Sequence, residues 1–392
     1  MTELNLEEIK AREAENGLRR PVRILYVLDG TQPSYGHKQL VRLLGQFTRM
    51  QLRAAVASIE NYGDAVEKIQ GKNVPVVSLE LDPAKSEKLS ERLGALIRLR
   101  TFIAHNNPEV LHLIGDNARS LGVLAASSFR SLPVVCSTRP HGRRSISSRF
   151  LDAMGSMIAN RPVHLFLDTD ELKLAEGRLG DQSPYEVIGH GIDFAAAQTA
   201  PLLDFEVLPP GTFDIGMPVS TVRCQAIREG LSAFKVFLGH CPQARLILFG
   251  DVKELDIEPW ATDLGVADQV LSLPLPQEPG ALLGRLNVLW AHDEVLPDQE
   301  MILQAMAIGL PVVVDHTTGL ADGIREIGGA MMRDGAWPQQ FAEATRDFMN
   351  DATLAQNVGN AGKALVKARF RFRTQAEKLR SIYARLVHGA DV

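Results

Sequence analysis

Several residue types and patterns are scarce in this sequence, and each shortage narrows the class of protein. The three cysteines have no metal-ligand spacing, which favours buried thiols in a reducing compartment. No apolar run reaches the roughly 18 residues that a membrane-spanning helix needs. Phosphate-binding P-loops, zinc-protease helices and hydrolase nucleophile elbows all have short signatures, and none of them occurs here. A Gly-x-Gly-x-x-Gly loop is also missing, which argues against dinucleotide binding.

The overall composition is that of an ordinary globular protein. Hydrophobic residues make up 45% and charged residues 23% of the 392 residues, a length that suggests two or three domains. The formal net charge of -5 gives no reason to expect a nucleic-acid partner. Residues 1–20 are charged and lack the apolar core of a signal peptide, so we expect a short helix or a mobile arm there. A cytoplasmic protein is expected.

Apolar strand-like runs alternate with amphipathic helical segments along nearly the whole chain. This alternation predicts parallel strand pairing through βαβ units. Two such series are separated by residues 195–210, which are rich in Ala, Pro and Leu and are expected to form the linker. In the first half, strands are predicted at 23–28, 54–59, 74–79, 110–114, 133–137, 163–167 and 185–188. In the second half, strands are predicted at 213–217, 245–249, 270–273, 287–291 and 310–314.

The expected fold class is α/β, with two Rossmann-like domains whose parallel sheets face a cleft. The predicted boundaries are an N-terminal arm at 1–20, a first domain at 21–200, a second domain at 201–369 and a C-terminal helical segment at 370–392.

The stretch 293–314 is the most informative part of the chain. It is predicted to run from a loop through a helix and a tight turn into a buried strand. Asp298 is predicted as the N-cap of the helix, and Gly309 is predicted to end it. Glu300 and Gln304 are four residues apart and are expected to share one helix face.

This stretch resembles the family-4 retaining glycosyltransferases, which have the GT-B fold. In that family a Glu, seven residues and a second Glu precede an Ala-Met-Ala segment and a Gly-x-Pro-Val-Val strand. The frame is present here, but Leu296 and Gln304 stand at the two acidic positions. The resemblance extends from about residue 22 onward and rests on further segments in the expected order: Val110–Gly115, His141-Gly142, Gly191–Asp193, Cys241–Asp251 and Leu264–Val270.

In the second half, the resemblance implies a site for the donor nucleotide-sugar. Gln304 would contact the ribose, and Glu300, on the same helix face, would be a further donor-binding residue. Glu294 would replace the missing acid near the donor sugar if the loop is re-routed. The alternative is an ordinary acidic loop and helix start. Four further residues at strand ends would contact the donor, with Arg223 on the diphosphate: Arg223, Gly250, Thr318 and Gly319. A solvated arginine and a plain turn are the competing interpretations.

In the first half, the resemblance implies that His141 lies near the anomeric carbon of the donor sugar. A loop histidine without that role is the alternative. The loop with Tyr35, Gly36 and His37 would bring a phosphate or the acceptor close to the backbone. Three arginines that follow His141 would meet an anionic membrane surface or a phosphorylated acceptor, or would simply be solvated: Arg143, Arg144 and Arg149.

Two functions remain open from the sequence. The first is transfer of a sugar from a nucleotide-sugar to a glycan or lipid-linked acceptor, with retention of configuration and without a metal or another cofactor. The catalytic residues would be His141 and Glu294. The second is a degenerate glycosyltransferase-like protein that binds a glycan, a nucleotide or a partner subunit. Peripheral contact with the inner membrane face fits either function, and no nucleic-acid partner is expected.

Overall fold

The computed structural model describes residues 21–29, 35–47, 50, 52–60, 65–81, 89–129, 131–137, 162–167, 172, 175, 184–204, 213–219, 224–250, 252, 255–276, 278–291, 296–314, 330–331 and 337–388. Contacts divide the chain into two compact units. The first unit runs to Gly191 and includes the C-terminal segment from Phe372, and the second spans Ile192–Arg371. The sequence suggested a boundary near residue 200, whereas the contacts divide at Gly191.

The first unit is built on a seven-stranded sheet whose order is β3-β2-β1-β4-β5-β6-β7. All pairs in this sheet are parallel. Its strands are β1 Val22–Leu28, β2 Leu52–Glu60, β3 Val76–Leu81, β4 Val110–Ile114, β5 Val134–Ser137, β6 Val163–Phe166 and β7 Tyr185–Val187. Its described helices are α2 Tyr35–Phe47, α3 Ala65–Gln70, α4 Leu89–Asn106, α5 Asp116–Ala126 and α16 Phe372–His388.

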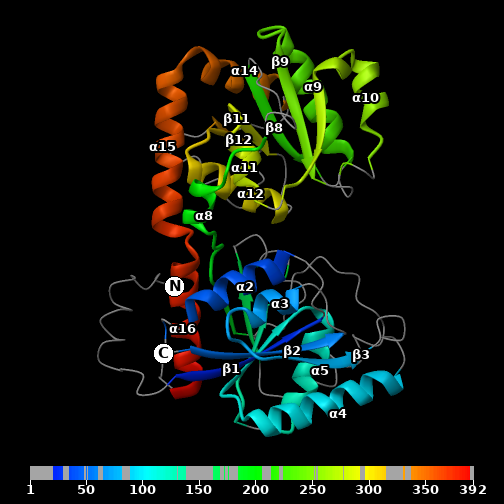
Figure 1. The fold of residues 1–392 in the computed structure, drawn as a ribbon, viewed down its shortest axis with the longest axis vertical. Helices are drawn as coiled ribbons and strands as arrows, with labels where there is room; N and C mark the ends of the chain where they lie inside the picture. The colour runs from blue at the N-terminus through cyan, green and yellow to red at the C-terminus, as the bar shows by residue number, and fades with distance from the viewer. Residues whose placement is uncertain are drawn as a thin grey trace. The chain divides into compact units, whose positions relative to one another are not determined.

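Helices cover both faces of this first sheet. On one face α2 and α16 pack through buried residues such as Leu44 and Leu379. On the other face α4 and α5 pack through residues such as Leu99 and Leu121 (Figure 1). A parallel sheet buried in this way needs apolar residues on both sides of each strand, which is why β1 reads Val-Arg-Ile-Leu-Tyr-Val-Leu.

The second unit repeats the plan with a six-stranded sheet of order β10-β9-β8-β11-β12-β13. Its strands are β8 Phe213–Val219, β9 Ala244–Gly250, β10 Val270–Pro274, β11 Val288–Ala291, β12 Val312–Val314 and β13 Ala330–Met331. Its described α-helices are α8 Phe194–Thr199, α9 Cys224–Leu238, α10 Ile257–Leu264, α11 Gly280–Leu283, α12 Leu296–Ile308, α14 Trp337–Asn350 and α15 Ala352–Arg369.

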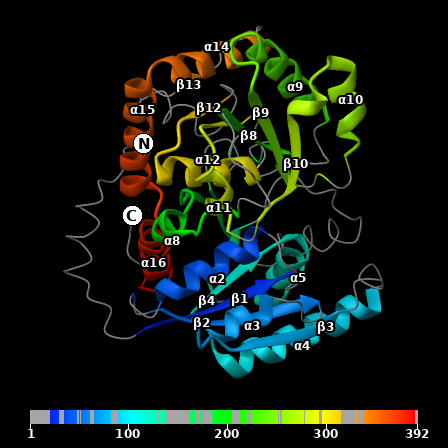
Figure 2. The ribbon, with the colours of Figure 1, turned by 45° about the horizontal axis from the view of Figure 1, so that its top comes forward.

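The two faces of the second sheet also carry separate helices. One apolar cluster includes residues of α9, α10 and α14. The other includes residues of α8, α11, α12 and α15, and α12 lies in the middle of that layer (Figure 2). In both sheets the strand order reverses once, at β1/β4 in the first and at β8/β11 in the second. Ligands of doubly wound sheets bind outside the carboxyl ends of the strands at such a reversal.

Three expectations about local structure were wrong. Tyr35, Gly36 and His37 were expected in a loop, but they form the first turn of α2. The expected linker begins with the short helix α8, whose N-cap Asp193 accepts a hydrogen bond from the Ala196 amide. Asp298 is not an N-cap, because α12 already begins at Leu296.

The end of α12 agrees with the sequence. Gly309 has a φ of 86°, a left-handed conformation that glycine adopts without strain. Its amide bonds the Met306 carbonyl, and the Leu310 amide bonds the Ala305 carbonyl, so the helix ends in a Schellman motif. A Cβ atom added to Gly359 of α15 would lie 2.0 Å from the Gly309 carbonyl oxygen. Glycine at position 359 therefore permits the close packing of α12 on α15.

We expect Gly359→Ala to lower the free energy of unfolding of the second unit by about 1–3 kcal/mol, because the new methyl group overlaps backbone. Gly265→Ala is the matched control, since Gly265 has a φ of 71° but nothing within 4 Å of an added Cβ. All three tryptophans lie in the second unit and all five tyrosines in the first, so tryptophan fluorescence during urea unfolding isolates the effect. A cost for Gly359→Ala no larger than for Gly265→Ala would contradict this account.

Candidate functional site

The carboxyl edge of the second sheet brings backbone groups unusually close together. Gly250 ends β9 with a φ of 136°, and a Cβ added there would lie 2.3 Å from the Val219 carbonyl oxygen at the end of β8. Only glycine fits this position without displacing a strand end. The sequence-predicted residue Gly250 thus lies at the end of a strand next to the β8/β11 reversal.

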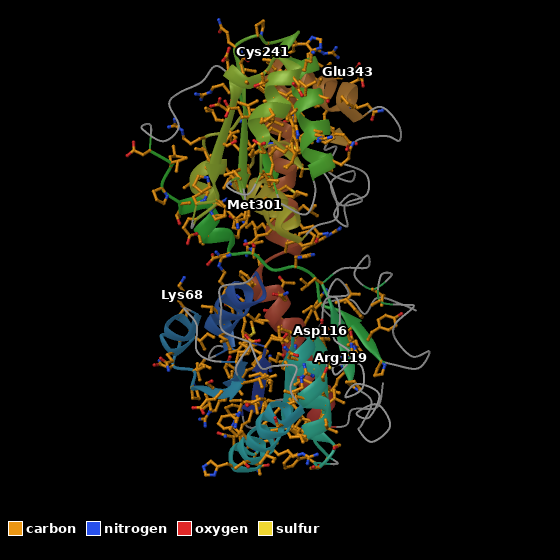
Figure 3. All side chains as sticks on the ribbon, turned by 90° about the vertical axis from the view of Figure 1, so that its right-hand side faces the viewer. Lys68, Asp116, Arg119, Cys241, Met301 and Glu343 are labelled. Carbon is orange, nitrogen blue, oxygen red and sulfur yellow. The ribbon has the colours of Figure 1, made fainter. Side chains whose placement is uncertain are left out.

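Helix α12 follows β11 and carries three buried polar side chains. Gln299, Glu300 and Gln304 are 3%, 9% and 5% exposed. The residues between and after them are apolar and also buried, among them Met301, which Figure 3 labels. Burial of polar groups is costly unless they form hydrogen bonds, so three such side chains on one buried helix need a partner or a function.

Glu300 and Gln304 are brought together as the sequence predicts. The Gln304 amide nitrogen Nε2 donates to Glu300 Oε1 over 2.9 Å. Because a carboxylate only accepts hydrogen bonds, this contact fixes which end of the amide faces Glu300. The Gln304 oxygen is therefore directed away from Glu300.

Gln299 was not singled out in the sequence, although it directly precedes Glu300. Its Oε1 atom is buried and has no hydrogen-bond partner among the described residues. Leaving a buried acceptor unsatisfied costs about 1–3 kcal/mol. The signal that would have identified it is its place beside Glu300 in the first turns of a helix whose later residues are apolar except for Gln304.

At the carboxyl edge of the first sheet, the carboxylate of Asp29 binds the N-terminus of a helix. Asp29 follows β1, and its Oδ1 accepts a hydrogen bond of 2.6 Å from the Ala118 amide in the first turn of α5. Gly115, with a φ of 109°, precedes this helix, and a Cβ there would lie 2.4 Å from Asp29 Cγ. Asp29 thus occupies the helix N-terminus at the β1/β4 reversal, where an anionic ligand would otherwise bind.

Burial dominates the electrostatics of this first edge. It raises the pKa of Asp29 to about 6, although the amides of Ala118 and Asn117 act in the opposite direction. The nearby carboxylates of Asp116 and Glu60 raise the pKa of Asp29 further. Burial also raises the pKa of Glu60. Figure 3 labels Asp116 at the start of α5.

Most of the other predicted site residues lie outside the described residues: His141, Arg143, Arg144, Arg149, Arg223, Glu294, Thr318 and Gly319. Tyr35, Gly36 and His37 are described only as backbone of α2. Within the described ranges, no group of three or more His, Cys, Asp or Glu residues is placed to hold a metal ion. No helix in the same ranges is both long and apolar enough to cross a membrane.

Comparisons with known proteins find similarity in structure only. No protein-family profile matches the sequence, and no curated protein matches it. A glycosyltransferase from Rickettsia africae aligns with a TM-score of 0.77 at 14% identity, covering 94% of this chain and 100% of the other. HepE from Anabaena, solved in complex with UDP and glucose, aligns with a TM-score of 0.72 at 19% identity, covering 91% and 98%.

A third similar structure has a name that assigns it to a different class of enzyme. A Listeria monocytogenes protein described as a UDP-N-acetylglucosamine 2-epimerase aligns with a TM-score of 0.61 at 14% identity, covering 95% of this chain and 98% of the other. At such identities the likeness establishes the architecture and leaves the reaction to the site. The chain therefore has the GT-B fold, as its sequence indicated.

We expect the free energy of unfolding of the first unit to depend on whether Asp29 is protonated. Its pKa in the folded protein, about 6, is above the ordinary 3.8, so the folded state holds this proton more tightly. The contribution of Asp29 to stability is then greatest below pH 4, falls as the pH rises to about 6 and stays constant above. Asp29→Asn removes this pH dependence. Between about pH 4 and pH 6 the wild type should therefore lose about 3 kcal/mol of unfolding free energy relative to the variant.

Tyrosine absorbance follows the first unit in this experiment, because all five tyrosines lie there. Asp263→Asn, at an exposed position on α10 of the second unit, is the matched control. Parallel pH profiles for Asp29→Asn and wild type would show that Asp29 has no raised pKa.

Proposed function

We propose that the chain binds a nucleotide-sugar at the carboxyl edge of the second sheet and transfers the sugar to a glycan or lipid-linked acceptor. The observation that carries this proposal is the buried polar set Gln299, Glu300 and Gln304 on α12, beside the β8/β11 reversal. In the family that the sequence resembles, the same part of the chain holds the ribose and the donor sugar.

The chemistry of these side chains suits a sugar hydroxyl pair. A carboxylate accepts hydrogen bonds from hydroxyl groups, and an amide both donates and accepts them. The Gln304–Glu300 contact orients the amide before a ligand arrives, which lowers the entropy lost on binding. The unpaired Gln299 oxygen would accept a further hydroxyl donor. Enclosed polar groups that are aligned in advance are typical of specific ligand sites.

The remaining roles rest on the family resemblance. Arg223 would pair with the diphosphate, whose negative charge grows as the sugar leaves. Gly250, Thr318 and Gly319 would bring backbone amides to the phosphates or the sugar. His141 and Glu294 would contact the sugar near the bond that breaks. The reaction would resemble that of family-4 retaining enzymes, with no metal and no resident cofactor.

A second function follows from one specific departure. Leu296 and Gln304 replace both acidic residues of the family pattern, and Leu296 has no group that can bind a sugar hydroxyl. The chain would then be a glycosyltransferase-like protein that binds a nucleotide, a glycan or a partner subunit without transfer. Arg143, Arg144 and Arg149 would contribute contacts with an anionic membrane surface or acceptor in either case.

We expect calorimetric titration with UDP, GDP, ADP, CDP and dTDP to show binding of at least one nucleotide. Gln304→Ala and Glu300→Ala should each weaken that binding, because one hydrogen bond is worth roughly 0.5–3 kcal/mol, or about two- to a hundredfold in affinity. Gln198→Ala is the control, since that glutamine bonds the Ala307 carbonyl at the other end of α12. No binding of any nucleotide at millimolar concentration would reject a donor site.

Transfer is tested separately from binding. With the nucleotide-sugar of the nucleotide that binds, an active enzyme should release the nucleoside diphosphate only when an acceptor is present, and Glu294→Ala should reduce that rate. In a chain that has lost transfer but kept the pocket, Leu296→Glu together with Gln304→Glu should instead increase affinity for the nucleotide-sugar. Change of the sugar without release of nucleotide would indicate an epimerase.

A further inference from the structure

Four polar side chains form one continuous hydrogen-bond chain inside the first unit. Tyr26 Oη on β1 lies 2.8 Å from Tyr383 Oη on α16. Tyr383 Oη lies 2.6 Å from His112 Nδ1 on β4, and His112 Nε2 lies 2.8 Å from Ser137 Oγ on β5. Tyr26, Tyr383 and His112 are at most 3% exposed, whereas Ser137 is partly exposed.

Counting hydrogens gives this chain a direction. A neutral imidazole carries one N–H, and each hydroxyl carries one O–H. If Ser137 donated to His112, each bond would reverse, and the Tyr26 hydrogen would be left buried without an acceptor among the described residues. If Tyr26 donates to Tyr383, each buried hydrogen has an acceptor. The single surplus hydrogen then falls on Ser137, the member of the chain that reaches the surface.

The surroundings keep the chain neutral and its rings in place. Burial lowers the pKa of His112 to about 3, so the imidazole carries no charge at neutral pH. Burial also raises the pKa of both tyrosines. The rings of Tyr26 and His112 pack with centroids 4.8 Å apart, and His112 meets Tyr383 edge-on at 5.9 Å. The direction of the hydrogen bonds from Tyr26 to Ser137 is therefore set by the fold and does not change with pH near neutrality.

Ser137 is the last residue of β5 and pairs with Ile114 of β4. Both lie at the carboxyl edge of the sheet, the edge that also carries Asp29 and Glu60. Of these two carboxylates Asp29 is the nearer to Ser137, because its carboxyl group lies against Gly115 directly after β4, whereas Glu60 ends β2, three strands away. A carboxylate repels anions and accepts hydrogen bonds from hydroxyl groups. An uncharged ligand with hydroxyl groups therefore matches one fixed donor at an acidic edge of the sheet.

We propose that Tyr26, Tyr383 and His112 are positioning residues that make Ser137 Oγ an obligate hydrogen-bond donor to a hydroxyl oxygen of an uncharged sugar. This inference deepens the proposed function, on which it rests, by naming the chemical class of the acceptor, a neutral glycan. It also gives the C-terminal helix a role beyond packing, since Tyr383 supplies the middle hydroxyl of the chain.

The direction of the hydrogen bonds through His112 can be tested without nucleotide and without turnover. The result of this test is therefore independent of the proposed function. Nitrogen-15 NMR of histidine-labelled protein distinguishes the two neutral tautomers, and loss of one signal set in His112→Gln assigns it among the ten histidines. The expected result is a single neutral tautomer protonated at Nε2 that does not change between about pH 5 and pH 8, a range that brackets the unperturbed histidine pKa. An Nδ1-protonated tautomer, or an imidazolium in that range, overturns the proposal.

The ligand class is tested with methyl glycosides of glucose, galactose, mannose and N-acetylglucosamine, and with inorganic phosphate. A hydrogen bond from Ser137 to a sugar makes Oγ a better acceptor, so at least one glycoside should shift the His112 Nε2–H signal. The shift should vanish in Ser137→Ala and persist in Ser128→Ala, a control at an exposed serine. A shift with phosphate alone, or with neither probe, overturns the sugar assignment.

Discussion

Burial of both faces of each parallel sheet is the constraint on which this structure depends. Helices cover each face, and the strands are apolar almost throughout. A parallel sheet enclosed in this way leaves its carboxyl edge as the natural place for ligand-binding groups. The two units share this architecture, so the differences between their edges are the best guide to what each unit binds.

The two edges treat their polar groups differently. In the first unit, Asp29 already occupies the N-terminus of α5, and the chain from Tyr26 to His112 satisfies its own buried hydrogens. In the second unit, α12 carries three buried polar side chains, and the Gln299 side-chain oxygen has no hydrogen-bond partner among the described residues. Unsatisfied buried polarity is costly, and a ligand that pairs with it recovers that cost. The first unit also has a buried polar atom without a partner in the described part of the chain, Ser58 Oγ on β2. The difference that favours nucleotide binding by the second unit is therefore the helix N-terminus of α5, which Asp29 already occupies in the first.

Sequence patterns predicted the α/β class and both sheets well, because parallel strands are long apolar runs that alternate with helices. They failed where a local signal was ambiguous. Gly36 suggested a loop, yet it lies in the first turn of α2, and the first residues of the expected linker form α8. The Glu300–Gln304 pair was predicted from helical spacing alone. The chain from Tyr26 to Ser137 joins residues up to 357 positions apart, so no local pattern could reveal it.

Hydrogen–deuterium exchange, read peptide by peptide with and without the nucleoside diphosphate that binds, will locate the nucleotide on one sheet edge or the other. We expect slower exchange in the first turns of α12 and at the ends of β8 and β9, because a bound ligand stabilises those amides against opening. We expect no such change at the start of α5, where Asp29 already occupies the helix N-terminus. Protection at α5 instead of α12, or no protection at either place, would contradict nucleotide binding by the second unit.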